Sequence, residues 1–230
     1  ADLDTHRLYY ECMGSGQPTV LIDYGIAGSA VAWRKLQAEL ARETTVCVYD
    51  RAGYGWSDPG PSPRTAAQAV EEMQGLIDAA GWHGPFVLLG HSFGGFDTRL
   101  FAARHPELVA GLVWLDSSHP EEALRASHDT PRAPLTNPIA QGTLHEGELD
   151  DEQAAGAYLN TRRKAIFTQM DELANFQTSA RQVLAAGELP DVPLVVVARE
   201  HAPGQSVADE ARWHERQQQL ARLSARGEFW

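Results

Sequence analysis

The amino-acid sequence predicts an α/β fold: a mainly parallel β-sheet with helices on both faces and a helical insertion in the second half of the chain. Two observations carry this prediction. Short apolar runs typical of buried strands alternate with segments of helical spacing along most of the 230 residues. The interval 118–189 has no strand pattern and is too long for a simple connection between strands. The length is that of one domain with enough chain for a large core.

The first half of the chain is expected to alternate strands and helices. Strands are predicted at Leu8–Cys12, Thr19–Asp23, Thr45–Tyr49 and Phe86–Leu89. Helical spacing appears from Trp33 to Leu40, and a second helix is expected to begin at Thr65 and end at Gly81. A third helix is expected after residue 93 and is stopped by Pro106. This alternation is typical of strands that run parallel and are joined by helices.

The second half is expected to contain a helical insertion and then return to the sheet. A buried strand at Gly111–Leu115 brings Asp116 to its end. Residues 118–189 are interpreted as a helical lid over the strand ends. Pro193–Ala198 resumes the sheet, and a last helix contains Trp213 and Leu220. The expected organisation is therefore a core over 1–117, a lid over 118–189 and the rest of the core over 190–230, without its final strand.

The strand at Phe86–Leu89 runs directly into Gly90-His91-Ser92-Phe93-Gly94, and a helix follows. This order is typical of a nucleophile elbow, a turn so tight that the serine hydroxyl stays exposed on a strained backbone. A Cβ at Gly90 or Gly94 is expected to collide with the neighbouring strand or helix. The pattern therefore predicts that Ser92 is a catalytic nucleophile, and a plain glycine-rich turn is the structural alternative.

Taken together, several segments resemble the α/β-hydrolase superfamily, in particular its lid-bearing serine esterases. They are Gly28-Ser29 with Trp33, the segment Tyr49–Asp58, the elbow itself and Leu115-Asp116-Ser117-Ser118-His119-Pro120. The resemblance covers nearly all of the chain. It implies that an activated serine attacks an acyl carbon while a histidine transfers protons and an acid orients the histidine.

The resemblance also implies roles for other residues. The backbone N–H groups of Phe93 and Ile26 are expected to form the oxyanion hole. Tyr24-Gly25 stands where the family commonly has His-Gly, which leaves the backbone donor in place. Asp116 is the favoured acid, Glu200 is the competing one, and a cap for the following helix is the structural alternative for Asp116.

The resemblance also implies a catalytic histidine, but no histidine occupies the expected position in this sequence. The family places it after the final strand, and the chain reaches Gly227-Glu228-Phe229-Trp230 where that strand is expected to begin. We therefore expect the final strand and the histidine to lie beyond Trp230. His201, just past a strand end, and His119, near Asp116, are the internal substitutes.

Composition excludes several other classes of protein. The chain has 19 basic and 31 acidic residues, a net charge of −12, and no basic cluster, which argues against nucleic acid as a partner. No apolar run approaches the ~20 residues of a membrane span. No His/Cys/Asp cluster has the spacing of metal ligands, so no metal and no cofactor are expected.

The two cysteines and the localisation leave alternatives open. Cys12 and Cys47 each fall in a predicted strand and are interpreted as buried thiols, with a cross-strand disulfide as the alternative. A cytoplasmic location is favoured, and a secreted mature form stays open. Asp50 and Arg51 are expected to form a buried pair that stabilises the loop beside the active site.

The predicted function is hydrolysis of carboxylic esters, lactones or thioesters through an acyl-enzyme on Ser92. The substrate is expected to be a small molecule with an apolar acyl or aromatic group. Apolar residues of the lid either meet that group or, as we favour, pack the lid onto the core; they are Tyr158, Ile166, Phe167, Met170 and Phe176. The alternative function is a catalytically silent or truncated binding protein, because no histidine occupies the expected position.

Overall fold

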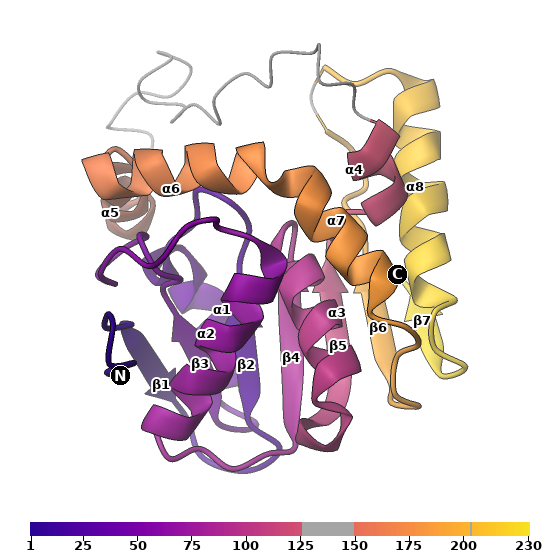
Figure 1. Ribbon diagram of the computed structural model, residues 1–230. Helices are drawn as coiled ribbons and strands as arrows, with labels where there is room; N and C mark the ends of the chain where they lie inside the picture. Colours follow the sequence, from indigo (N-terminus) through magenta and orange to yellow (C-terminus); the bar gives the residue numbers. More distant parts are fainter. Residues whose placement is uncertain (126–149, 203) are drawn as a thin grey trace.

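A seven-stranded sheet forms the centre of the computed structural model, which describes residues 1–125, 150–202 and 204–230 (Figure 1). Its strand order is β1-β3-β2-β4-β5-β6-β7, and every neighbouring pair is parallel except β1 with β3. The strands are β1 (Tyr10–Met13), β2 (Val20–Asp23), β3 (Val46–Tyr49), β4 (Phe86–His91), β5 (Val109–Leu115), β6 (Leu194–Val197) and β7 (Gly227–Phe229). The predicted α/β fold with a mainly parallel sheet is confirmed.

Helices cover both faces of this sheet. On one face the large buried cluster draws side chains from α2 (Ala66–Ala79), α3 (Gly94–Arg104) and α8 (Val207–Ala221). On the other face a smaller cluster packs against the short 3-10 helix η1 (Ala30–Trp33) and α1 (Arg34–Leu40). Another 3-10 turn, η2 (Pro106–Leu108), ends the α3 segment at the predicted proline. The two clusters bury the sheet on both sides, as parallel strands require.

Three central strands end together, and this fixes where a site can form. Asp23 of β2 lies opposite Gly90 of β4, and His91 of β4 lies opposite Leu115 of β5. The loops that follow these strands therefore leave the sheet at the same edge. In open parallel sheets ligands bind outside the carboxyl ends of the strands, so this edge is the expected place for a site.

A helical insertion connects β5 to β6 and crosses the upper edge of the sheet in Figure 1. Its described helices are α4 (Pro120–Arg125), α5 (Asp151–Asn160), α6 (Arg163–Ala174) and α7 (Phe176–Ala185). Side chains of α7 accept hydrogen bonds from the first turn of α2, from Ala66 N–H to Ser179 Oγ at 3.0 Å and from Ala67 N–H to Gln182 at 3.0 Å. Residues 126–149 of the predicted lid lie outside the described part of the chain.

The segment that was expected to be only the start of the final strand already forms a strand of the sheet. Residues Gly227–Phe229 form β7, which pairs in parallel with β6, with Leu194 opposite Gly227 and Val196 opposite Phe229. The segment is too short and too polar to show a strand pattern, and its pairing with β6 depends on backbone hydrogen bonds rather than on apolar alternation.

The preference for free thiols is wrong, because Cys12 and Cys47 form a disulfide. The antiparallel pairing of β1 with β3 places the two residues directly opposite each other. Cys47 is buried, whereas Cys12 is exposed. Strand register decides which cysteines meet, and the pattern of a single strand does not reveal it.

The prediction that the apolar side chains of the insertion pack onto the core is wrong for most of them. Tyr158 on α5 and Ile166, Phe167 and Met170 on α6 are exposed rather than packed on the core. Phe176 alone among the five packs as expected, with its ring centroid 5.8 Å from that of Phe93. The exposed face of α6 is therefore apolar, and the buried face is polar.

Candidate active site

Ser92 occupies a tight turn between β4 and α3. Its φ angle of +51° lies in the left-handed region that non-glycine residues rarely adopt. A Cβ on Gly90 would lie 2.4 Å from Thr98 Oγ1, and a Cβ on Gly94 would lie 2.2 Å from the Asp23 carbonyl oxygen. The expected collisions with the neighbouring helix and strand are confirmed, and only glycine fits at either position.

Backbone hydrogen bonds hold this turn against the end of β5. Ser92 N–H donates to the Leu115 carbonyl at 3.3 Å, and the Ser92 carbonyl accepts from Ser118 N–H at 3.0 Å. The two partners, Leu115 and Ser118, lie on either side of Asp116 in the chain, so Asp116 lies at the same edge of the sheet as Ser92. The half-buried Ser92 makes no side-chain hydrogen bond to any residue in the described ranges. Its hydroxyl is therefore not committed to a structural contact there.

The loop Tyr24–Ala27, which follows β2, lies directly against Ser92. A Cβ on Gly25 would come within 2.8 Å of Ser92 Cβ and 3.2 Å of Ser92 Oγ. Ile26, the next residue, is one predicted oxyanion donor, and Phe93 is the other. Neither backbone N–H donates a hydrogen bond to a residue that the structure describes. Both groups thus lie beside the serine without an acceptor from this part of the chain.

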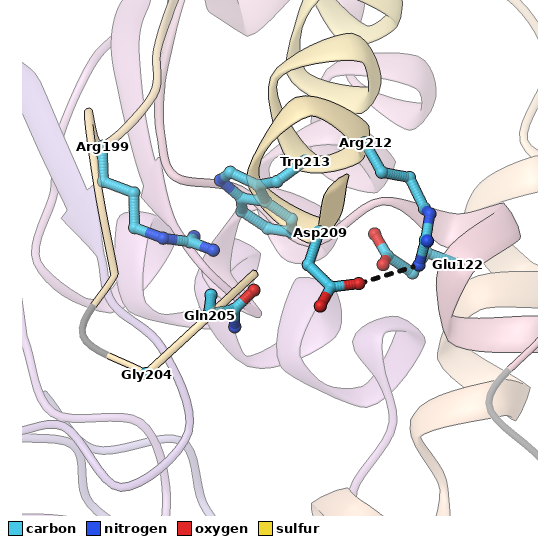
Figure 2. Close-up of a pocket in the computed structure, with 7 residues that line it drawn as sticks. All are labelled: Glu122, Arg199, Gly204, Gln205, Asp209, Arg212 and Trp213. Carbon is cyan, nitrogen blue, oxygen red and sulfur yellow. Dashed lines mark ion pairs between the residues drawn. The ribbon is translucent and has the colours of Figure 1, made fainter. Parts of the chain in front are cut away.

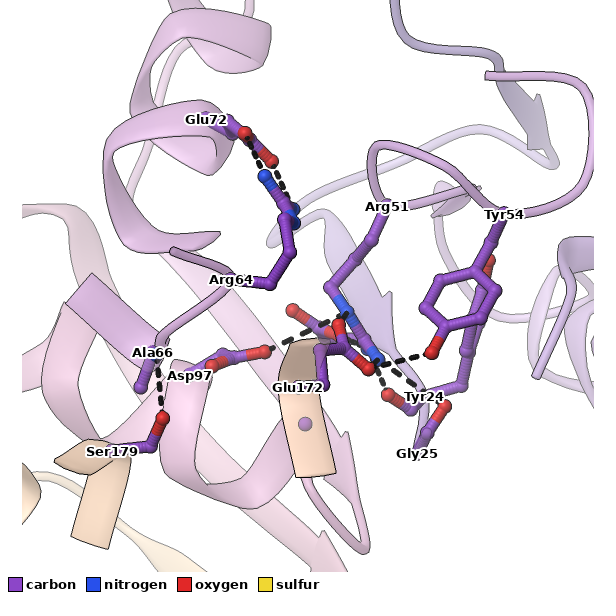
Figure 3. A network of polar contacts seen from close by, with 12 residues as sticks. Tyr24, Gly25, Arg51, Tyr54, Arg64, Ala66, Glu72, Asp97, Glu172 and Ser179 are labelled. Atoms are coloured by element: carbon purple, nitrogen blue, oxygen red, sulfur yellow. Dashed lines mark hydrogen bonds and ion pairs between the residues drawn. The ribbon is translucent and has the colours of Figure 1, made fainter. Parts of the chain in front are cut away.

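Behind this loop, Arg51 uses all five of its N–H groups (Figure 3). One Nη1 hydrogen is donated to Asp23 at 2.7 Å, and the other is donated to the Tyr24 carbonyl. Nη2 donates to the Gly25 carbonyl at 3.3 Å, and Nε and Nη2 donate to the two oxygens of Glu172 at 3.2 and 3.4 Å. The side chain is 1% exposed, so a buried cation is fully paired here.

Asp50 and Arg51 are both buried, as predicted, but they do not pair with each other. Asp50 accepts instead from the Tyr24 hydroxyl at 2.7 Å, from Ala30 N–H at 2.7 Å and from Trp56 N–H at 2.9 Å. The partners of Arg51 come from β2 and α6. The expectation of an Asp50–Arg51 pair is therefore wrong, because adjacent side chains point to opposite sides of the chain.

Asp97 on α3 is a buried carboxyl group without a hydrogen-bond partner among the described residues. Its Oδ2 lies 3.9 Å from Arg51 Nε. Burial raises the pKa of Asp97 well above its ordinary value, the nearby Asp23 adds to this rise, and Arg51 opposes it.

Asp116 ends β5 in a left-handed conformation, with φ of +46°. Its Oδ1 accepts from the Arg199 backbone N–H at 3.2 Å and from Trp213 Nε1 at 2.6 Å, and its Oδ2 accepts from Arg199 Nη1 at 2.6 Å. It does not cap α4, whose first-turn bond runs from Ala123 N–H to the His119 carbonyl. Glu200, the competing acid, is exposed.

Arg199 and Trp213, which hydrogen-bond to Asp116, also line a cavity of about 510 Å³ (Figure 2). The Arg199 guanidinium lies 4.4 Å from the centre of the Trp213 ring. Charges of both signs line the cavity: Glu122, Arg199, Gly204, Gln205, Asp209, Arg212 and Trp213. Asp209 and Arg212 form an ion pair at 3.3 Å. The sequence did not reveal Arg199 and Trp213, because they reach Asp116 from a loop and a helix more than 80 residues away.

No histidine in the described ranges hydrogen-bonds to Ser92 or Asp116. His91 packs on Trp33 with ring centroids 5.3 Å apart, and burial lowers its pKa while Asp116 opposes that change. His201 is exposed and faces Glu210 at 3.5 Å. His119 is buried, and burial, reinforced by Arg216, lowers its pKa to about 4. Neither substitute hydrogen-bonds to the serine.

Within the described ranges, no group of three or more His, Cys, Asp or Glu side chains is placed to hold a metal ion. The described helices also include none that is long and apolar enough to cross a membrane.

A serine at a strand–turn–helix elbow, on the carboxyl edge of a mainly parallel sheet, defines the hydrolase type of α/β protein. A family model described as the alpha/beta hydrolase fold matches residues 18–220. This chain belongs to the α/β-hydrolase family.

Individual comparisons agree with that membership. An uncharacterized protein of Schizosaccharomyces pombe is 28% identical over 199 residues, and an AB hydrolase superfamily protein of Gibberella zeae is 30% identical over 179 residues. These matches cover 81% and 72% of this chain but only 36% and 56% of the two relatives. The crystal structure of an enol-lactonase from Burkholderia xenovorans is similar with a TM-score of 0.71 and 19% identity, covering 100% of this chain and 89% of that one. At that identity the likeness shows the fold alone.

Proposed function

We propose that this chain carries the nucleophile of a serine hydrolase that cleaves carboxylic esters, lactones or thioesters. The Ser92 oxygen bonds to the acyl carbon, and the bond from that carbon to the leaving oxygen or sulfur breaks. The proton lost by the Ser92 hydroxyl is transferred to the leaving group. Water then hydrolyses the acyl-enzyme, which releases the acid and restores the serine hydroxyl.

The observation that carries this proposal is the setting of the Ser92 hydroxyl. It sits on a left-handed turn, has no structural hydrogen bond within the described ranges, and lies beside the N–H groups of Ile26 and Phe93. Two such donors stabilise the negative charge that develops on the acyl oxygen. Asp116 is the proposed acid that orients the base, and no described residue is assigned as that base.

For the substrate we infer a small molecule with an apolar acyl or aromatic group. The exposed apolar side chains of α5 and α6, such as Tyr158 and Phe167, support this class. The Cys12–Cys47 disulfide supports an oxidising compartment, and so the secreted alternative rather than the favoured cytoplasmic location.

A second candidate is a binding protein that no longer turns substrate over. The hydrogen bonds of Asp116 favour this candidate. Both carboxylate oxygens already accept from Arg199 and Trp213 rather than from a histidine. Loss of the base from a serine triad lowers turnover by about a million-fold. Such a protein would retain the turn at Ser92 and the oxyanion donors while binding esters without cleaving them.

Labelling with a fluorophosphonate separates the two candidates, because the reagent forms a bond only with an activated serine hydroxyl. The folded protein is incubated with the reagent, and the adduct is located by peptide mass spectrometry. A hydrolase gives an adduct on Ser92 that Ser92→Ala lacks. Labelling of the wild-type protein no faster than of Ser92→Ala would overturn the hydrolase proposal and support the binding protein.

A further inference from the structure

The loop Tyr24–Ala27, which we call the oxyanion loop, has contacts that the proposed function does not explain. It carries the Ile26 N–H that the proposal assigns to the acyl oxygen. Its own backbone groups are held by side chains from two other parts of the chain. Some of these side chains follow β3, and others come from the helical insertion.

Arg51 fixes the direction of the Ile26 N–H. Its guanidinium donates to the carbonyls of Tyr24 and Gly25. The Gly25 carbonyl and the Ile26 N–H belong to one trans peptide unit, in which the two groups point in opposite directions. Because the carbonyl faces Arg51, the N–H faces away from it. Rotation of this peptide would remove the donor from the site and break the bond to Arg51.

Ala27, the last residue of the oxyanion loop, is held on both sides. Its φ of +62° is an unfavourable conformation for a residue with a Cβ, so the surroundings must maintain it. Its carbonyl accepts from the Asn160 amide at the end of α5. The Tyr54 phenol lies close to the backbone of Ala27. Burial raises the pKa of this phenol, Glu172 adds to the rise, and the backbone of Ala27 opposes it.

Glu172 of α6 connects both anchors (Figure 3). Its carboxylate accepts from Arg51 Nε at 3.2 Å and from the Tyr54 hydroxyl at 2.6 Å. The side chain is 2% exposed, and the helix presents it to the core although the opposite face of α6 is apolar and exposed. A carboxylate in this position orients Arg51 and Tyr54 at once, and these two side chains hold the backbone on either side of Ile26.

We propose that Glu172 is a positioning residue: through Arg51 and Tyr54 it sets the conformation of the oxyanion loop, so that docking of the helical insertion aims the Ile26 N–H at the acyl oxygen. This inference rests on the proposed function. It makes the insertion part of the catalytic apparatus rather than only a cover over the site.

The test uses Glu172→Gln, which keeps the size of the side chain but removes its charge, and Tyr54→Phe, which removes one hydroxyl and keeps the aromatic packing. The matched control is Glu72→Gln. Glu72 is also a buried glutamate in an ion pair, with Arg64 at 2.7 Å, but it makes no hydrogen bond to the oxyanion loop. Glu72→Gln therefore measures the effect of breaking a buried ion pair that does not contact the oxyanion loop.

Two measurements are made on each protein. The first is the kinetics of fluorophosphonate labelling of Ser92, separated into the affinity for the reagent and the maximal rate of bond formation. Loss of a complete oxyanion donor lowers turnover by about 100- to 1,000-fold, so misalignment of one donor by Glu172→Gln should lower the maximal rate by about tenfold or more. The affinity should change little, because ground-state contacts remain.

The second measurement is amide hydrogen exchange of peptides that span residues 21–31, which does not depend on catalysis. Glu172→Gln and Tyr54→Phe should accelerate exchange in this segment, whereas Glu72→Gln should leave both exchange there and labelling within about twofold of the wild type.

The outcomes are distinguishable. If the wild-type protein is labelled at Ser92 and Glu172→Gln is labelled equally fast with unchanged exchange in residues 21–31, the inference is wrong and the proposed function stands. Equal losses in Glu172→Gln and Glu72→Gln would also overturn it, because a general effect of buried pairs would then suffice. Absence of labelling in the wild type would overturn the proposed function and the inference together.

Discussion

His119 offers a quantitative test of the structure through the pH dependence of stability. Its side chain is 8% exposed, and burial lowers its pKa from 6.5 to about 4, with Arg216 reinforcing the change and Glu121 opposing it. Between these two pH values the unfolded chain binds a proton that the folded protein does not. Folding therefore becomes less favourable as pH falls through this window, and the effect is absent above the unfolded pKa. A gap of this width corresponds to about 3 kcal/mol.

The assay is urea unfolding of the wild type and of His119→Gln at several pH values from 7 to 4. The difference in unfolding free energy between the two proteins should shift by about 3 kcal/mol across that range, in favour of the variant at low pH. His201→Gln is the matched control, because the His201 side chain is 67% exposed. A difference between wild type and His119→Gln that stays constant with pH would refute the reasoning, as would an equal shift in His201→Gln.

Two further predictions concern Asp97 and the disulfide. Asp97→Asn should raise the unfolding free energy at pH 8 by about 1–3 kcal/mol, because it replaces a buried carboxyl group that can ionise by a neutral amide of the same size. The pKa of Asp97 is raised in the folded protein, so the wild type loses stability as pH rises, and the stability gained by Asp97→Asn should be smaller at pH 5 than at pH 8. Urea unfolding curves at pH 5 and pH 8 check this. A larger gain at pH 5 would contradict it. Replacing Cys12 and Cys47 by serine should lower the unfolding free energy by about 4 kcal/mol, because the bridge closes a loop across a sequence separation of 35. A reductant should destabilise the wild type equally and leave the double variant unchanged, and free thiols in the unreduced unfolded protein would show that the bridge is absent.

The parts of the fold that could be predicted are those with a local cause. The elbow at Ser92 requires a glycine two residues before it and another two residues after it. The strand that leads into it and the neighbouring strands of the sheet are short apolar runs with clear ends. Thr65 begins α2 as expected, since its hydroxyl accepts from Gln68 N–H at 3.3 Å. Each of these features depends on neighbours in the sequence.

The features that were missed depend on pairing between distant segments. The disulfide requires the register of β1 against β3, and β7 exists because β6 offers it a free edge. Glu172 reaches Arg51 across 121 positions, and no pattern near either residue indicates that contact. The contacts of Arg199 and Trp213 with Asp116 could not be predicted either, since polar contacts between distant segments leave no periodicity in the sequence.

The distance in sequence between Arg51 and Glu172 has a consequence for how the protein reaches its final state. Protein chains emerge from the ribosome beginning at the N-terminus, so Arg51, Asp23 and Asp97 are available long before Glu172 is made. Until the helical insertion is made, the Arg51 cation faces Asp23 and Asp97 without Glu172, and the Ala27 carbonyl lacks its bond from Asn160. The central strands can pair early because their contacts are within the first half of the chain. Completion of the buried polar cluster, and with it the shape of the site, is a late event of synthesis.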